Sequence, residues 1–305
     1  MKSMLDSVSF RKSFFSLLFI LFFIISIPVL TQTQEVQFLR TTESALQTSV
    51  YTLVSKDSNI RLKVIGVVHV ADKQYYQNIQ TIINDLDYLF YEGIRVSPKS
   101  QTSYKQKLLP ASLVSQVLDD TNTRRSIKKY SDLKSEIAKF LSLADQTEYL
   151  KPRANWINAD MDFNQFVELL QTHKIGFDSL STNLSGDNNS IAKDYSEIVN
   201  MESKDTLEYT QRISKFKRKM SQNLVKSASD LCYLEEMKLP REAIIIARNK
   251  VALGFLKSKF SSEFPLELGL LYGAAHTPNF VEILTQEYKF EIESYEWLDA
   301  WSLQN

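Results

Sequence analysis

The pattern of apolar and polar residues near the start of the chain predicts a strand–helix–strand unit. Residues 49–55 and 60–68 are rich in β-branched and aromatic side chains and flank a polar stretch at 56–59, which is typical of a hairpin. Apolar side chains then recur at helical spacing over residues 73–86, and residues 88–91 form a short apolar run. We expect the strands at 60–68 and 88–91 to be parallel neighbours joined by a right-handed crossover.

The rest of the chain predicts further helices and two more strands. Amphipathic or charged helical patterns cover residues 111–151, 163–173 and 194–237, and another helix is expected from Pro240 to about residue 256. Apolar runs at 266–272 and 290–297 predict strands on either side of a short helix at 278–286. We therefore predict a single α/β domain, a mixed β-sheet flanked by helices, with a helical insert at about residues 98–240.

The first thirty residues form a separate unit. Residues 14–30 are almost continuously apolar and follow a basic stretch containing Lys2, Arg11 and Lys12. This length lies between that of a signal-peptide core and that of a membrane span. We expect residues 1–33 to be a signal peptide or an N-terminal membrane anchor. Residues 34–305 would then be exported, either secreted or periplasmic, or held at a membrane through the N-terminal segment.

Composition excludes two classes of protein. Lysine plus arginine equals aspartate plus glutamate at 36 each, so the chain lacks the basic excess of a protein that binds nucleic acid through its phosphates. The single cysteine, Cys232, excludes an intramolecular disulfide and any metal site rich in thiolates.

Two of the three histidines occupy matched positions. Gly66-Val67-Val68-His69 and Gly273-Ala274-Ala275-His276 each follow a predicted strand, and Glu92 follows the strand at 88–91. Ligands bind open α/β sheets at the carboxyl edge, where all three side chains would emerge. Two histidines and a glutamate suffice to hold a catalytic divalent metal with an open position for water. They are equally able to act as a general base and its partner without a metal.

Four dispersed motifs carry a family resemblance. Over about residues 49–297 the chain resembles the TraB/GumN and Tiki superfamily in the segments 66–71 with 90–93, 158–162, 247–249 and 272–278. The resemblance implies the fold of erythromycin esterases and ChaN haem-binding proteins. It also implies a site made of His69, Glu92, Arg248 and His276, with Asp160 as a secondary candidate.

The resemblance also implies an activity. In the Tiki branch it is metal-dependent proteolysis, with manganese or cobalt favoured, and zinc remains a third choice of divalent metal. In the TraB branch the implied role is to shut down a peptide pheromone. The resulting prediction is an exported metal-dependent hydrolase, with His69, Glu92 and His276 as metal ligands and a peptide or small ester as substrate. The alternative is a non-catalytic protein that binds and sequesters a peptide or haem on the same fold.

Two of the site residues leave their roles open. Arg248 either orients Glu92 or binds a carboxylate or carbonyl of the substrate. Asp160 either belongs to the site or caps the helix that begins near Phe163. The third histidine, His173, lies at a helix end beside Lys174 and is expected to interact with the helix dipole.

Overall fold

The computed structural model describes residues 35–95, 135–136, 138–175, 188–201 and 206–304. The chain divides into two compact units, Met1–Glu35 and Val36–Asn305, and the description below concerns the second. The expected export segment at 1–33, the polar stretch that follows residue 96 and most of the helix expected from residue 111 lie outside the described residues. Within the described ranges, no helix has both the length and the apolar character needed to cross a bilayer.

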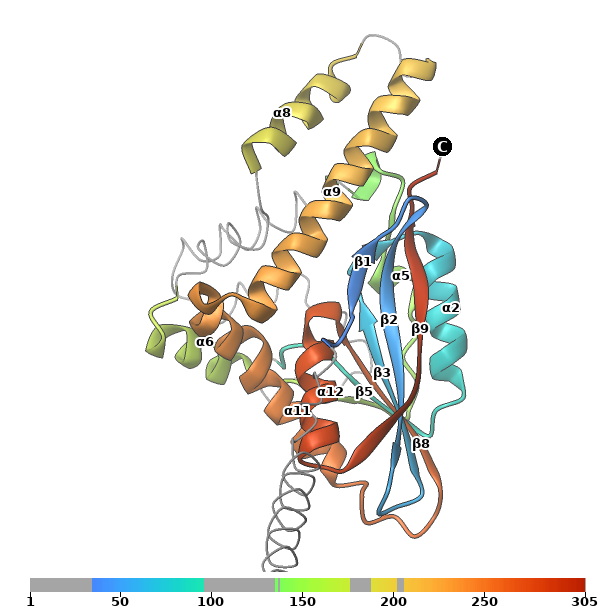
Figure 1. Cartoon of the computed structure of the whole chain (residues 1–305), viewed down its shortest axis with the longest axis vertical. Coiled ribbons are helices and arrows are strands. Elements are labelled where there is room, and N and C mark those ends of the chain that lie inside the picture. Colours follow the sequence, from blue (N-terminus) through green and yellow to red (C-terminus); the bar gives the residue numbers. More distant parts are fainter. Residues whose placement is uncertain (1–34, 96–134, 137, 176–187, 202–205, 305) are drawn as a thin grey trace, which may run out of the picture. The chain divides into compact units, whose positions relative to one another are not determined.

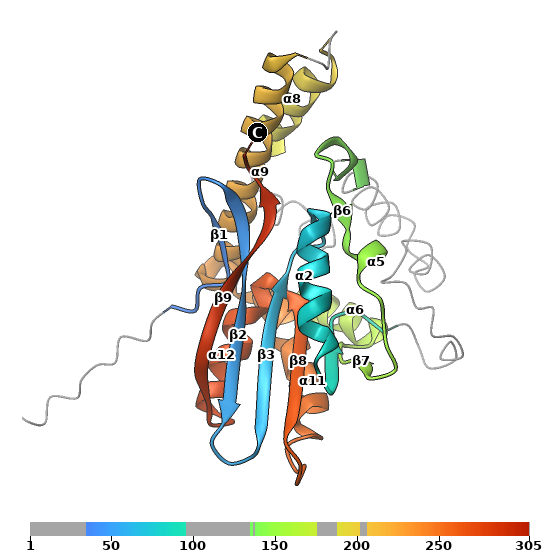
Figure 2. The same ribbon diagram turned by 90° about the vertical axis from the view of Figure 1, so that its right-hand side faces the viewer.

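A mixed sheet forms the centre of the body, which confirms the coarse α/β class. Four of its strands run parallel: β3 (Ile60–Val67), β8 (Leu266–Gly273), β5 (Tyr88–Tyr91) and β7 (Trp156–Asn158). On the other side, β2 (Ala45–Ser55) pairs antiparallel with β3, and β1 (Leu39–Thr41) and β9 (Phe290–Ser302) pair antiparallel with β2. Figure 2 shows β9, β2, β3 and β8 side by side.

The expected adjacency of the first two parallel strands is wrong. β3 and β5 are parallel, but β8 lies between them and pairs with both. β8 is a nearly continuous apolar strand with five consecutive buried residues, and such strands belong at the centre of a sheet, where helices cover both faces. The crossover from β3 through its helix therefore spans two strand positions instead of one.

Helices cover both faces of the sheet (Figure 1). One face packs against α2 (Lys73–Asn84), and its strands contribute buried apolar side chains to that layer: Val50, Ile65, Leu89 and Leu271. The opposite face packs against α11 (Ala247–Lys257) and α12 (Thr277–Gln286), and the adjacent positions in sequence point there: Tyr51, Val64, Phe90 and Leu270. This period-2 alternation creates two apolar cores, in which each fully buried side chain contributes roughly 1.5–3 kcal/mol.

The span between β5 and β8 carries most of the remaining helices. They are α5 (Gln146–Tyr149), α6 (Phe163–Thr172), α8 (Asn188–Val199), α9 (Leu207–Tyr233), η2 (Glu235–Met237) and α10 (Lys238–Arg241). The same span also supplies β7 to the main sheet and β6 (Ala144–Asp145), which pairs with β4 (Val70–Ala71) just after His69. Figure 1 shows α8 lying beside the long helix α9.

The helix expected to begin at Pro240 begins slightly earlier. Pro240 is the third residue of α10, within the first turn, where a missing N–H costs no helical hydrogen bond. The helix continues through a π-helical turn, η3 (Glu242–Ile246), directly into α11. The π turn packs against α6 in a small apolar cluster. This packing fixes the start of α11, which carries Arg248.

Candidate functional site

The predicted site residues meet at the carboxyl edge of the sheet. β3 leads to His69, β5 to Glu92, and β8 through the short 3-10 helix η4 (Ala274–His276) to His276. β7 ends two residues before Asp160, and Arg248 reaches the same edge from the first turn of α11. Because these four strands are parallel, residues far apart in sequence leave the sheet side by side.

Glu92 is held by both of its carboxylate oxygens. Oε2 accepts the backbone N–H of Gly273 at 2.6 Å, and Oε1 accepts Nη2 of Arg248 at 2.8 Å. A β-carbon at Gly273 would lie 3.2 Å from Oε2, so the absence of a side chain there permits the short bond. The glycine of the second Gly-x-x-His motif therefore serves a close approach to Glu92.

Arg248 joins two carboxylates in a buried chain. Its Nε and Nη2 donate to Oδ1 and Oδ2 of Asp160 at 2.9 and 2.5 Å, and Nη2 also reaches Glu92. The Arg248 side chain is 7% exposed and lies over the ring of Phe166. A bidentate pair fixes the plane of a guanidinium, so Arg248 is held in one orientation with Nη2 on Glu92; its role in orienting Glu92 stays a prediction.

Asp160 belongs to the hydrogen-bonded series that links it through Arg248 to Glu92. Its alternative role as a helix cap is wrong. Asp162 is the N-cap of α6 and forms a capping box with Gln165. The fully buried Asp160 side chain instead accepts the backbone N–H groups of Gly93 and Met161 at 2.9 and 2.7 Å, besides the guanidinium. Asp162 thus caps the helix, and Asp160 accepts the hydrogen bonds of Arg248.

His276 is buried with one ring nitrogen paired. Its Nδ1 lies 2.6 Å from Oδ1 of Asn249, and its Nε2 lies 3.7 Å from Oε1 of Glu92. Burial lowers the pKa of His276 to about 4, even though the Glu92 carboxylate acts in the opposite direction. The imidazole is therefore neutral at pH 7 and able to accept a proton.

The charges around His276 are fixed by their partners. Burial alone would raise the pKa of Glu92, but Arg248, helped by His276, His69 and the Gly273 amide, holds that pKa well below its usual range. For Arg248, the two carboxylates outweigh the effect of burial and hold its pKa above the ordinary value. Glu92 therefore stays ionised beside a neutral histidine.

His69 lies at the same edge but is exposed. It contributes to the lowered pKa values of both Glu92 and His276, while no hydrogen bond joins it to either of them within the described residues. Its Nδ1 lies 3.2 Å from Oε1 of Gln146, and the Gln146 backbone N–H donates to the His69 carbonyl at 3.1 Å. His173, in contrast, is the C-cap residue of α6, as expected for a residue at a helix end.

Two residues that contact the motif histidines, Asn249 and Gln146, were not among the predicted site residues. Each places an amide oxygen on Nδ1 of one motif histidine. Asn249 follows Arg248 in sequence and is fully buried. The position of Asn249 directly after a predicted site arginine was the available signal in the sequence. Once buried, its amide requires hydrogen-bond partners.

The donor types suit a divalent metal, but the described residues do not form an assembled shell. Imidazole nitrogens and a carboxylate oxygen are common ligands of catalytic divalent ions. Within the described residues, however, no three His, Cys, Asp or Glu side chains are grouped so that they could hold a metal ion. Each oxygen of Glu92 already accepts one hydrogen bond, from Gly273 or from Arg248.

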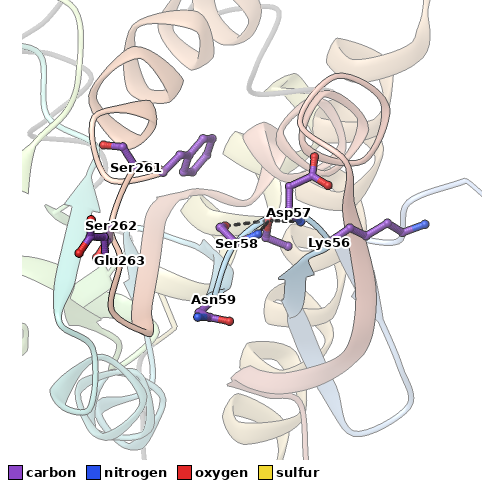
Figure 3. A pocket seen from close by; sticks show the side chains of 9 residues that line it. Lys56, Asp57, Ser58, Asn59, Ser261, Ser262 and Glu263 are labelled. Atoms are coloured by element: carbon purple, nitrogen blue, oxygen red, sulfur yellow. Dashed lines mark hydrogen bonds between the residues drawn. The ribbon is translucent and has the colours of Figure 1, made fainter.

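A hollow of about 500 Å³ lies at the opposite edge of the sheet (Figure 3). It is lined by the turn between β2 and β3 and by the loop that precedes β8, including Lys56, Asp57 and Glu263. These segments meet the strands at the ends remote from Glu92 and His276. The hollow is therefore separate from the candidate site.

Comparison with known proteins gives no relative. No family model, curated protein or solved structure matches this chain.

Proposed function

We propose that this chain is an exported hydrolase that cleaves a peptide bond, with ester hydrolysis as the second possible reaction. The site comprises His69, Glu92, Arg248 and His276, with Asp160 holding Arg248. The observation that carries the proposal is that the buried neutral imidazole of His276 faces the ionised carboxylate of Glu92. Nε2 of His276 lies 3.7 Å from Oε1 of Glu92.

Two hydrogen-bond acceptors face each other across this gap. With Nδ1 of His276 bonded to an amide oxygen, its Nε2 carries a lone pair, and Oε1 of Glu92 carries a negative charge. Such a pair binds a group that donates to both, and a water molecule has two O–H groups. The arrangement therefore suits the binding and activation of a nucleophilic water.

The reaction follows from these roles. The water oxygen attacks the carbonyl carbon of the substrate while His276 Nε2 takes one of its protons. The imidazolium so formed is stabilised by the neighbouring Glu92 carboxylate, and it then gives the proton to the departing amine or alcohol. Arg248 and Asp160 keep Glu92 ionised and in place, and His69 is positioned to contact the substrate from the exposed side.

A divalent ion, with manganese, cobalt and zinc as the choices, is a further part of the proposal. His69, Glu92 and His276 would hold it, and it would polarise the bound water. Elemental analysis of the purified full-length chain tests this part. Absence of stoichiometric metal, together with hydrolysis that chelators leave unchanged, would remove it while leaving the water-activating pair intact.

The proposal includes the family and the finer fold. The TraB/GumN and Tiki resemblance and the erythromycin esterase/ChaN-like fold are supported by the order of the motifs and by their convergence on one sheet edge. Export through residues 1–33 is supported by the apolar segment in the sequence.

Hydrolysis by site variants tests the function. Full-length wild type is screened against a labelled peptide library and small chromogenic esters, alongside His276→Ala, His69→Ala and Glu92→Gln. We expect loss of general-base catalysis at His276 to reduce kcat about 10²–10⁴-fold, with His173→Ala unchanged as the matched control. Full activity of both motif variants would place the site elsewhere. Equal ligand binding by wild type and Glu92→Ala, with no turnover by either, would support a sequestering protein instead.

A further inference from the structure

The contacts of Asn249 determine which nitrogen of His276 carries the proton. The Asn249 side chain is fully buried, and its Nδ2 donates to the backbone carbonyl of His276 at 3.2 Å and to Oδ1 of Asn279 at 3.0 Å. A backbone carbonyl only accepts hydrogen bonds, so the atom that faces it must be the nitrogen. The Oδ1 of Asn249 is therefore the atom that lies 2.6 Å from His276 Nδ1.

An amide oxygen cannot donate, so the short contact requires a proton on Nδ1. The neutral imidazole then has a bare lone pair on Nε2, which is the nitrogen that faces Glu92 at 3.7 Å. Free neutral histidine prefers the opposite tautomer, with its proton on Nε2. That tautomer would point an N–H at Glu92 and leave Nε2 without the lone pair that accepts a proton from the proposed water.

We propose that Asn249 is a positioning residue that fixes His276 in the Nδ1–H tautomer and so leaves Nε2 free for the reaction. Its effect on turnover rests on the proposed hydrolase function, whereas the tautomer itself does not. Gln146 offers His69 a similar contact at 3.2 Å. The His69 pair is partly exposed, so its oxygen and nitrogen positions are less constrained than those of Asn249.

Nitrogen-15 spectroscopy reads the tautomer directly. The full-length chain is labelled with ¹⁵N-histidine and measured at pH 7.5, with signals assigned through His69→Gln and His173→Gln. We expect His276 to show a protonated, pyrrole-type Nδ1 and an unprotonated, pyridine-type Nε2 in the wild type. An Nε2–H tautomer in the folded wild type would overturn the proposal, whatever the activity.

Two substitutions separate the acceptor from the donor role of Asn249. Asn249→Ala removes both, and we expect the proton of His276 to move to Nε2. Asn249→Asp loses the donors to His276 and Asn279 but keeps an acceptor, so Nδ1 should stay protonated. The exposed Asn78→Ala is the matched control and should leave the spectrum unchanged. Retention of Nδ1–H in a folded Asn249→Ala variant would overturn the proposal.

Turnover provides a second readout. On a substrate that the wild type cleaves, Asn249→Ala should lower kcat/KM by about 10–100-fold, mainly through kcat, because the base is mis-oriented while substrate contacts remain. A wild type with the expected tautomer but no hydrolysis would refute the hydrolase function and leave the role of Asn249 standing. An unchanged kcat in a variant whose tautomer has switched would refute the link between the two.

Discussion

Replacing Arg248 by methionine removes the guanidinium that joins Asp160 to Glu92. Three hydrogen bonds to carboxylate oxygens, at 2.9, 2.5 and 2.8 Å, would be lost in a site where the arginine side chain is 7% exposed. Methionine fills a comparable apolar volume beside Phe166, so the main effect is the loss of charge and hydrogen bonds.

The expected cost at neutral pH is about 3–5 kcal/mol, because removing one partner of a buried ion pair leaves an uncompensated buried charge. Asp160 would keep two backbone donors and Glu92 would keep one. These remaining hydrogen bonds reduce the loss of folding free energy but do not neutralise the charge of either carboxylate.

The cost should depend on pH with a definite sign. In the wild type the pKa of Glu92 lies below its unfolded value, so this group stabilises the fold above about pH 4.3 and loses that contribution as the pH falls toward the folded pKa. Without Arg248, burial raises the folded pKa above the unfolded one, and the fold is then favoured when Glu92 is protonated. The stability gap between wild type and variant should therefore be widest near pH 7.5 and narrow toward pH 4.5.

Urea unfolding followed by tryptophan fluorescence at both pH values measures the gap. The matched control is Arg212→Met on α9, which breaks exposed pairs with Glu208 at 3.0 Å and Glu197 at 3.8 Å and should cost about 0.3–1 kcal/mol. A cost below about 1 kcal/mol for Arg248→Met at pH 7.5, or a gap that widens on acidification, would refute the reasoning.

Three further outcomes follow from the geometry. Because His276 must be neutral to accept a proton and has a pKa of about 4, kcat/KM should rise through pH 4 and stay flat across neutrality; a midpoint near pH 6.5 in the pH–rate profile would contradict this. Gly66→Ala should destabilise the protein by about 1–3 kcal/mol in thermal unfolding, since the added carbon would lie 2.9 Å from Oγ1 of Thr277 and 3.2 Å from the Ala274 backbone; an unchanged Tm would contradict this. Asp162→Ala should cost about 1 kcal/mol of stability and spare kcat, whereas Asp160→Asn should reduce kcat; equal kinetic losses would argue against the division of roles.

Spacing and periodicity were sufficient for the elements that present the site. The two Gly-x-x-His motifs and Glu92 each follow a strand with a clear apolar pattern, and parallel strands bring their carboxyl ends to one edge. The helix positions near Phe163 and Thr277 also follow from apolar periodicity. The local pattern of apolar residues predicts these positions because it reflects which face of a single strand or helix is buried.

The order of the strands could not be obtained in this way. β8 lies between β3 and β5 because it packs against helices on both faces. The sequence from residue 60 to residue 91 contains no signal for the strand that is inserted there. The three-residue strand β7 is too short for any periodic signal, although it leads to Asp160. Such features depend on partners that are distant in sequence.

Hydrogen-bond partners were the least accessible part of the site. Asn249 stands in the motif at 247–249, but that position does not say which side chain it contacts, and its bond to His276 appears only when His276 is brought against α11. The choice between Asp160 and Asp162 as helix cap likewise depended on a difference of two residues in where the helix begins.

The central place of β8 has a consequence for how the protein acquires its structure. Ile60 pairs with Leu266, so the middle of the sheet closes only when segments from near the two ends of the body meet. Contacts of such high sequence separation slow folding, because the loop-closure entropy is lost before the pairing energy is gained. Until residues 266–273 arrive, the edges of β3 and β5 that later bind β8 lack that partner, and His69 and Glu92 have no frame that sets their distance. The candidate site is therefore completed only after this long-range pairing has formed, and a chain truncated before β8 would present two open strand edges prone to aggregation.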